Sequence, residues 1–267
     1  MIPPADLGRP WRNGFESLWV AEHTHIPASR RSSVARGCGA PADVLRDPRP
    51  SSWRLPAAAD GHHDPEGRHR HLPRAPARSG SCWRSSSRSL DVVSNGRFLF
   101  GVGGGWNAEE MENHGGEFSG RWKLMRERIE AMKAIWAADP AEYHGELVDF
   151  DPIWSKPKPV QTPHPPIHVG GTAPYGPRRA ARYGNGWIPI NGRGDIIDEL
   201  PILAAECEKV GRDPAEIELT LYAAPTDRAE IERLEAAGVH RLVFGLPQAG
   251  ADVVLPLLDS YAAVIHG

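Results

Sequence analysis

From about residue 90 to its end, the chain alternates short apolar stretches with longer amphipathic ones at the spacing of βα units. This alternation constrains the fold more than any other feature. Parallel strands joined by helical crossovers give such a pattern, so it predicts a parallel sheet covered by helices. These units close readily into a (β/α)8 barrel, whose chemistry lies at the carboxyl ends of the strands, and a doubly wound open sheet is the alternative.

The individual elements are predicted from apolar periodicity and from glycine and proline stops. The helix within residues 119–140 has the clearest period, because Trp122, Ile129 and Trp136 recur on one face. The other helices are expected within residues 172–184, 195–211, 227–238 and 251–265, and the strands within 97–102, 165–171, 186–190, 217–224 and 240–247. A small extended insertion is expected at 142–153, and a short buried strand at 14–20.

Charge is distributed unevenly along the 267 residues. The formal net charge is −3, yet residues 30–89 contain 12 arginines, no lysine and five acidic residues, a local balance of +7. The remainder is therefore near −10, which is −3 minus 7. Because the apolar residues of the basic stretch follow no period, that stretch taken alone is predicted to be a disordered linker.

Cysteine content and hydropathy indicate the compartment. The three cysteines show no CxxC spacing, which argues against a disulfide framework and favours a reducing environment. No apolar run is long enough to span a membrane, and the first ten residues lack the order of a secretory signal. We therefore expect a cytoplasmic protein without a membrane partner.

Glycine-rich turns follow two of the predicted strands. Gly103, Gly104 and Gly105 follow the strand within 97–102 and precede Trp106. A backbone without side chains can approach a flat ring or a phosphate closely, and the alternative is a plain tight turn. The turn does not match the GxGxxG dinucleotide fingerprint, so a Rossmann site is disfavoured.

The second glycine-rich turn is Gly170-Gly171-Thr172, which precedes a predicted helix. Backbone N–H groups at a helix start bind phosphate, and late βα loops of barrels often use this property. Gly186 and Trp187 stand at the start of the next strand. We predict that both glycine turns and this pair bind a cofactor.

Two histidines, His23 and His25, follow the predicted strand at 14–20. Imidazoles at a strand end can hold a substrate or a ring edge, or relay a proton. The alternative is a solvated loop. A metal site is disfavoured, because no third ligand stands at a suitable spacing.

Several stretches together carry a family resemblance: "SLDVVSNGRFLFGVGGGWNAEEMENHG", "RWKLMRERIEAMKAIW", "FDPIWSKPKPVQTPHPPIHVGG" and "YGNGWIPI". They resemble the luciferase-like oxidoreductases, in particular the actinobacterial branch that uses the deazaflavin coenzyme F-420. The stretch "GFESLWVAEHTHIPASRRS" is similar to the second strand and following loop of that family. The resemblance covers roughly residues 14–32 and 89–267.

The resemblance implies a (β/α)8 barrel that binds F-420, or FMN as the alternative, at the carboxyl ends of its strands. It implies hydride transfer between the cofactor and a small organic substrate, or activation of oxygen. It places His23 and His25 near the ring as catalytic residues, residues 103–106 under the cofactor, and residues 170–172 at its phosphate. Neither a metal nor a nucleic acid is implied, and a homodimer is left open.

The sequence departs from the family pattern in two places. The chain opens at "MIPPADLGRP", so the first barrel strand is expected to be missing. The third strand should lie between residues 33 and 88, where the arginine-rich stretch stands instead. We therefore expect an incomplete barrel: a single domain over residues 1–267, with a disordered segment at 33–88 and an intact C-terminal part at 89–267.

The stretch at residues 33–88 is interpreted as a frameshifted reading of a GC-rich gene. Read one nucleotide later, the codons of residues 61–79 permit a strand that contains Gly-Thr-Gly, which the family places there. The alternatives are a metal site at the four histidines of residues 62–71 and a nucleic-acid arm, which would need more stacking aromatic residues. The chain as written is then either an active deazaflavin oxidoreductase or an inactive remnant of one.

Overall fold

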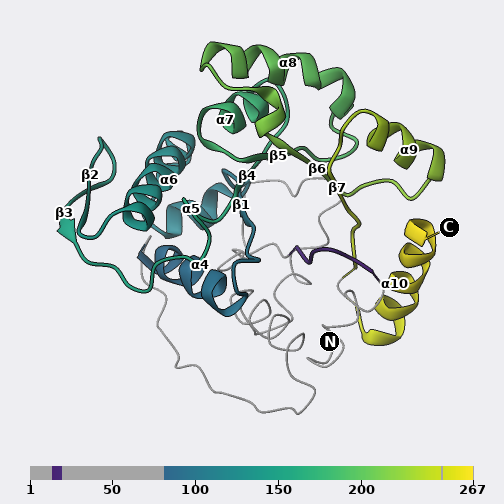
Figure 1. The fold of residues 1–267 in the computed structure, drawn as a ribbon, viewed down its shortest axis with the longest axis horizontal. Helices are drawn as coiled ribbons and strands as arrows, with labels where there is room; N and C mark the ends of the chain where they lie inside the picture. Colours follow the sequence, from purple (N-terminus) through teal and green to yellow (C-terminus); the bar gives the residue numbers. More distant parts are fainter. Residues whose placement is uncertain (1–13, 20–80, 248, 267) are drawn as a thin grey trace. The chain divides into compact units, whose positions relative to one another are not determined.

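Five parallel strands form the main sheet (Figure 1). The computed structural model describes residues 14–19, 81–247 and 249–266. Within these residues the strand order is β1-β4-β5-β6-β7, as the alternating sequence pattern predicts. The strands are β1 (Phe100–Val102), β4 (Ile167–Gly170), β5 (Gly186–Ile188), β6 (Glu218–Tyr222) and β7 (Arg241–Val243).

The described residues fall into two compact units. The first includes Gly105–Pro165 and the described residues up to Phe98. The second includes Leu99–Gly104, Pro166–Pro247 and the chain from Val254 onward. The whole five-stranded sheet therefore belongs to the second unit.

Register separates apolar and polar side chains onto the two faces of the sheet. Val169 pairs with Trp187, and Trp187 pairs with Leu219, so these three side chains point to one face. All three are buried. Helix α7 (Tyr175–Tyr183) covers this face, because Cγ2 of Val169 lies 2.9 Å from the position that a Cβ would take on Gly184, directly after the helix.

The opposite face carries polar side chains toward the amino ends of the strands. His168 and Glu218 are both register partners of Gly186, and Arg241 is the partner of Thr220. His168 and Thr220 are fully buried, and the Arg241 guanidinium forms an ion pair with Glu218. A side chain at position 186 would collide with this layer, because a Cβ there would lie 2.3 Å from Nδ1 of His168.

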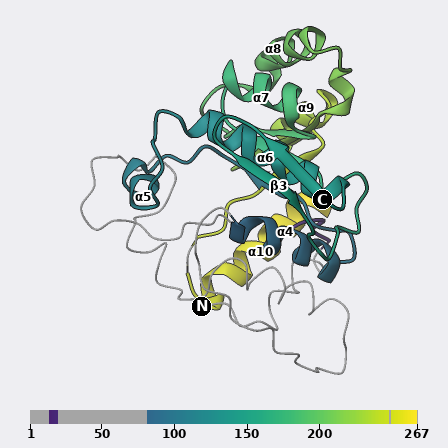
Figure 2. The same ribbon diagram turned by 90° about the vertical axis from the view of Figure 1, so that its left-hand side faces the viewer.

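The helices after β4 lie where the sequence predicts them: α7, α8 (Ile196–Lys209), α9 (Arg228–Ala236) and α10 (Ala251–His266). Aspartates begin two of them. Asp195 accepts a hydrogen bond from the Ile197 N–H at 2.9 Å, and Asp227 accepts one from the Glu230 N–H at 3.0 Å. These caps satisfy N–H groups that a helix leaves open. Helices α7 and α8 pack side by side (Figures 1 and 2).

Helix α6 (Arg121–Ala137) organises the first unit. The apolar period predicted from the sequence is confirmed, because Ile129, Met132 and Trp136 are all buried. The unit also contains α4 (Ser81–Val93), α5 (Ala108–Asn113) and the antiparallel pair β2 (Ala141–His144) and β3 (Asp149–Ile153). The β2–β3 hairpin is the extended insertion that the sequence indicates at 142–153.

A buried carboxylate fixes this hairpin to α6. Glu127 accepts hydrogen bonds from the backbone N–H groups of Leu147 at 2.6 Å and Val148 at 3.0 Å. Glycine is required at position 145, because a Cβ there would lie 2.6 Å from a Glu127 carboxylate oxygen. The Leu147 hydrogen bond is the main cause that lowers the pKa of Glu127, although burial opposes it.

Helix α4 starts at Ser81, whereas the sequence indicates regular structure only from residue 89. Helix α4 forms through residues 81–88 because its inner side is tied down: Ser87 and Arg88 are buried, and the Arg88 guanidinium donates to Ser155 Oγ. Asp91, fully buried, accepts hydrogen bonds from the N–H groups of Val160 at 2.6 Å and Gln161 at 3.0 Å. The expectation of disorder is thus wrong for 81–88, and its remainder lies outside the described residues.

The strand expected at 14–20 is not found at residues 14–19, which form a turn followed by irregular backbone with no buried side chain. A short apolar run without a period does not by itself specify a strand. None of the described strands pairs with residues 14–19. That prediction is wrong for the described residues of the stretch.

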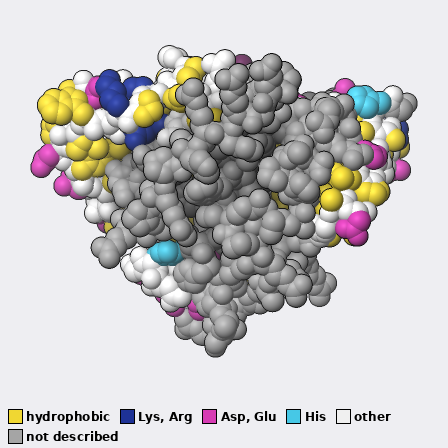
Figure 3. All heavy atoms as spheres, turned by 90° about the horizontal axis from the view of Figure 1, so that it is seen from below, with side chains coloured by type: hydrophobic (Ala, Val, Ile, Leu, Met, Phe, Trp, Pro, Cys, Tyr) yellow, Lys and Arg dark blue, Asp and Glu magenta, His cyan; other side chains and the backbone are white. Residues whose placement is uncertain are grey.

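Apolar side chains also reach the surface of the described part (Figure 3). The largest is Trp154, which follows β3 and is 81% exposed. Scattered apolar side chains are ordinary on protein surfaces. Among the described residues, no helix is long and apolar enough to cross a membrane.

Removing the Asp91 carboxylate should destabilise the first unit. In Asp91→Ala the N–H groups of Val160 and Gln161 lose a buried acceptor, and we expect the free energy of unfolding to fall by about 2–4 kcal/mol. Urea denaturation, monitored by circular dichroism, measures this free energy of unfolding. Asp151→Ala, which removes an exposed carboxylate from the same unit, is the control and should change the midpoint little.

Attachment of the hairpin should depend on pH. Because the pKa of Glu127 is lowered, its carboxylate stabilises the hairpin above the ordinary value of 4.5, and this stabilisation is lost as the pH falls through the lowered pKa. Hydrogen exchange at the amides of Leu147 and Val148, corrected for intrinsic rates, should accelerate in that acidic range. Persistent protection of both amides in acid would contradict the role given to Glu127.

Candidate functional site

The carboxyl edge of the parallel sheet is the candidate site. Parallel strands all end at the same edge, so the turns that follow β1, β4, β5, β6 and β7 meet there. Two of these turns are the glycine-rich ones that the sequence singles out. Their residues within the second unit are Gly103, Gly104, Gly170, Gly171 and Thr172.

The turn after β1 offers open backbone. Gly103 is exposed, and a Cβ added to it would meet no atom within 4 Å, whereas Gly104 is buried. Gly105 has a φ of +71°, a left-handed conformation that favours glycine. Trp106 follows and is half-buried. Gly103 therefore leaves room for a flat group to lie against the main chain.

Asn107, which the sequence reading missed, carries a buried donor directly after this turn. The side chain is 3% exposed, and its Oδ1 accepts the Glu110 N–H at 3.2 Å and so caps α5. Its Nδ2 has no hydrogen-bond partner. A buried amide without a partner costs about 1–3 kcal/mol, so such groups require an explanation, and a ligand is one. The sequence signal was an N-cap residue that directly follows a glycine run.

The turn after β4 is rigid. Gly171 has a φ of +137°, its N–H donates to Ile188 O at 3.3 Å, and its carbonyl accepts the indole N–H of Trp187 at 2.8 Å. The N–H of Gly176 donates to Thr172 O at 2.7 Å and closes the first turn of α7. The loop is therefore held by bonds to the neighbouring strand and to its own helix.

Gly176 is a second residue that the sequence reading missed. A Cβ there would lie 2.1 Å from the Gly171 carbonyl oxygen and 2.7 Å from Nε1 of Trp187. Only glycine lets α7 start this close to the strand. Arg179, one turn further, brings its Nη1 to 3.9 Å from the position that a Cβ would take on Gly171, which adds a positive charge beside the loop.

Gly186 and Trp187 do not lie with the other predicted cofactor-binding residues. Gly186 is the first residue of β5, at the amino end of the strand, where it makes room for His168. Trp187 is fully buried on the helix-covered face and reaches the site only through its bond to Gly171. The structure therefore places Gly186 at the amino end of β5 and Trp187 beneath the Gly171 loop, and their contact with a cofactor stays a prediction.

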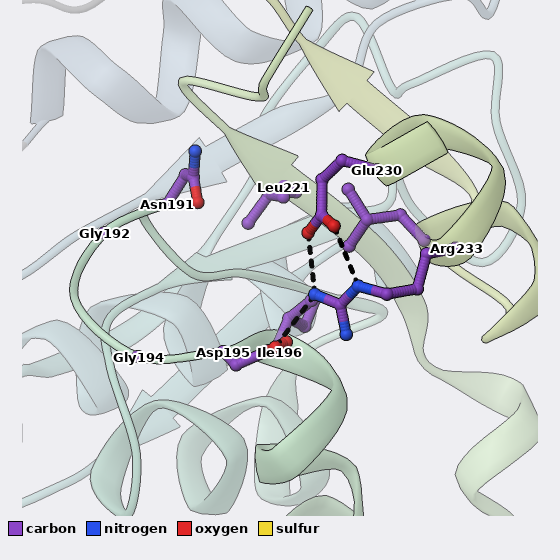
Figure 4. A pocket seen from close by; sticks show the side chains of 9 residues that line it. Asn191, Gly192, Gly194, Asp195, Ile196, Leu221, Glu230 and Arg233 are labelled. Atoms are coloured by element: carbon purple, nitrogen blue, oxygen red, sulfur yellow. Dashed lines mark hydrogen bonds and ion pairs between the residues drawn. The ribbon is translucent and has the colours of Figure 1, made fainter. Parts of the chain in front are cut away.

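The turn after β5 borders a cavity of about 290 Å³ (Figure 4). Leu221 and Leu234 belong to its apolar lining. Nη2 of Arg233 bridges two carboxylates across it, Asp195 at 2.8 Å and Glu230 at 2.7 Å. The pKa of Asp195 is lowered, first by the N–H of Ile197 and then by Arg233. This bridge joins the start of α8 to α9.

A further carboxyl, Glu199, faces both the Ala173 N–H and Gly194. Burial raises the pKa of Glu199, while the hydrogen bond from Ala173 lowers it. His23 and His25 lie outside the described residues. No group of three or more potential metal ligands is found in the described part of the chain.

Comparison with known proteins identifies the fold. The family model of luciferase-like monooxygenases matches residues 85–256. An uncharacterized protein of Mycobacterium tuberculosis is 33% identical over 270 residues, covering 94% of this chain and 89% of that protein. The crystal structure of an F-420-dependent secondary alcohol dehydrogenase superposes with a TM-score of 0.68 at 16% identity, over 98% of this chain and 92% of that one. The chain therefore has the fold type of this family, a (β/α)8 barrel, of which the described residues form five parallel strands.

Two shorter similarities concern proteins of named activity. An F-420-dependent glucose-6-phosphate dehydrogenase of Amycolatopsis mediterranei is 32% identical over 113 residues, 40% of this chain and 32% of that protein. An FMNH2-dependent dimethylsulfone monooxygenase of Pseudomonas putida is 34% identical over 107 residues, 39% of this chain and 29% of that protein.

A methyl group at position 103 should test the open turn. The fold has room for it, so Gly103→Ala should leave the thermal midpoint unchanged. A flavin-type ligand lying against the turn would be displaced, and we expect at least about tenfold weaker binding, because overpacking costs ~1–3 kcal/mol. Gly120→Ala, in ordinary contact with Glu117, is the control. Unchanged affinity in Gly103→Ala would remove this turn from the site.

The free amide of Asn107 gives a second test. Asn107→Asp keeps an oxygen to cap α5 but removes the donor. We expect about tenfold weaker ligand binding, as for one hydrogen bond, with unchanged helix content. Equilibrium titration and circular dichroism measure the two quantities. Equal affinity of the two proteins would show that Nδ2 serves no ligand.

Proposed function

Because the chain belongs to the luciferase-like monooxygenase family, we propose that it is an oxidoreductase that transfers hydride between coenzyme F-420 and a small organic substrate. The observation that carries this proposal is the open backbone of the glycine turn at Gly103. The turn provides a flat backbone surface for a ring. The similarity to an F-420-dependent dehydrogenase supports the choice of cofactor.

The residues present fit a flavin or deazaflavin with a phosphate. When bound, such a cofactor supplies the carbon or nitrogen that accepts or donates hydride. Gly103 would allow the ring to approach the main chain. The loop Gly171–Pro174, at the start of α7, would hold the phosphate, with Arg179 as its counter-charge. Trp187 would keep that loop in position through its hydrogen bond to the Gly171 carbonyl.

A second candidate is an FMN-dependent monooxygenase of the same fold, which the similarity to the dimethylsulfone enzyme favours. Both cofactors need the same ring surface and the same phosphate loop. His23 and His25 remain proposed catalytic residues near the ring in either case. Cytoplasmic location and a homodimer are proposed as well.

We further propose that about residues 33–88 are a frameshifted reading of a GC-rich gene. The match begins only at residue 85, although the Mycobacterium tuberculosis alignment spans 94% of this chain. The arginine excess and the lack of lysine support the proposal. An inactive remnant is then the alternative to an active enzyme. The nucleotide sequence tests this proposal. A strand that contains Gly-Thr-Gly should be encoded in another reading frame, and its absence from all three frames would contradict a frameshift.

Cofactor titration tests the proposed function. Quenching of deazaflavin or flavin fluorescence is followed as protein is added, both for the chain as written and for a frame-restored chain. We expect the frame-restored chain to bind F-420 more tightly than FMN, and the chain as written to bind more weakly. Failure of the frame-restored chain to bind either cofactor would contradict the assignment, and tighter binding of FMN would favour the monooxygenase.

A further inference from the structure

Glu199 is a carboxyl group placed against the loop that would hold the phosphate. It lies in the first turn of α8 and is half-buried. The backbone N–H of Ala173, in the middle of the loop, acts on this carboxyl group and lowers its pKa, against the effect of burial. A carboxyl group therefore already faces the segment that would bind a cofactor anion.

Glycine at position 194 allows this placement. Gly194 has a φ of +149°, and a Cβ there would lie 2.3 Å from Oε1 of Glu199. The turn after β5 and the loop after β4 thus enclose the same carboxyl group from two sides. Burial is the first cause that raises the pKa of Glu199.

The other charges near the loop come from three elements. Arg179 of α7 lies beside Gly171 and opposes Glu199 in sign. Asp195, at the start of α8, raises the pKa of Glu199 further, but Asp195 is itself paired with Arg233 of α9 at 2.8 Å. Among the described residues, the guanidinium of Arg179 and the carboxyl group of Glu199 thus lie beside the loop.

We propose that Glu199 sets how much negative charge the loop accepts, so that a phosphodiester is favoured over a phosphomonoester. A phosphodiester carries one negative charge. A phosphomonoester has a second pKa of about 6 and carries nearly two charges at neutral pH. The additional charge would face the Glu199 carboxylate. The proposal rests on the proposed function, because it takes the loop to hold a cofactor phosphate.

This charge selection separates the two candidate cofactors. F-420 joins its ribityl chain to its tail through a phosphodiester, whereas the phosphate of FMN is a terminal monoester. Glu199 would act as a specificity-determining residue that disfavours FMN. One additional elementary charge several ångströms from a carboxylate near a protein surface is worth roughly tenfold in affinity.

The test compares Glu199→Gln with the parent in the chain as written and in the frame-restored chain. Glutamine can still accept the Ala173 N–H and loses only the charge. F-420, FMN and riboflavin, which has no phosphate, are titrated at pH 7.5 and pH 5.5. Asp198→Asn is the control, since it removes an exposed carboxylate from the same helical turn.

At pH 7.5 we expect Glu199→Gln to improve FMN binding about tenfold relative to F-420 and to leave riboflavin unchanged. At pH 5.5 the difference between variant and parent should shrink, because FMN gains a proton and the raised pKa of Glu199 lets it begin to protonate. Arg179→Gln should have the opposite effect to Glu199→Gln, because it should weaken the binding of FMN more than the binding of F-420.

The outcomes distinguish the two proposals. Binding of neither cofactor to either parent chain overturns the proposed function, and with it the role of Glu199. Binding with an unchanged ratio of FMN to F-420 affinity in Glu199→Gln overturns only the charge selection. Equal improvement of FMN and riboflavin also overturns it, because a change that does not involve the phosphate would then be the cause.

Discussion

The hydrogen bond from the Trp187 indole to the Gly171 carbonyl is the interaction on which the site depends. It joins the most deeply buried aromatic side chain of the sheet to the loop at its carboxyl edge. Because the indole cannot move within a packed core, it fixes the position of that loop before any ligand arrives. Gly176 makes the bond sterically possible, since any side chain there would occupy the same space. Packing of Trp187 within the sheet thus holds the loop at the carboxyl edge in position before a ligand binds.

The same principle, a buried group that orders an otherwise free segment, recurs through the described part of the chain. Asp91 and Glu127 each satisfy two backbone N–H groups of a distant segment. Asp195 both caps α8 and meets Arg233 of α9. Asn107 differs from these, because only its oxygen has a partner.

Much of the fold could be predicted from the sequence, because period and stop signals are local. The helix with Ile129 and Trp136 on its buried face and the alternation after residue 165 are of this kind. The roles of Gly186 and Trp187 could not be predicted, since the two faces of a buried parallel strand look alike in sequence. Gly176 and Glu199 owe their importance to close approaches to other segments, and Asn107 owes its importance to a burial that the sequence does not show. Helix α4 depends on Asp91, whose partners lie some 70 residues away.

The central claim is that the carboxyl edge of this sheet binds a phosphate-bearing flavin-type cofactor. Hydrogen exchange with and without F-420, resolved by peptide, tests it most directly. The account predicts slower exchange in the peptides that contain Gly103–Asn107 and Gly171–Gly176, with little change in the β2–β3 hairpin. Protection confined to other segments, or no protection at a saturating concentration of F-420, would contradict it.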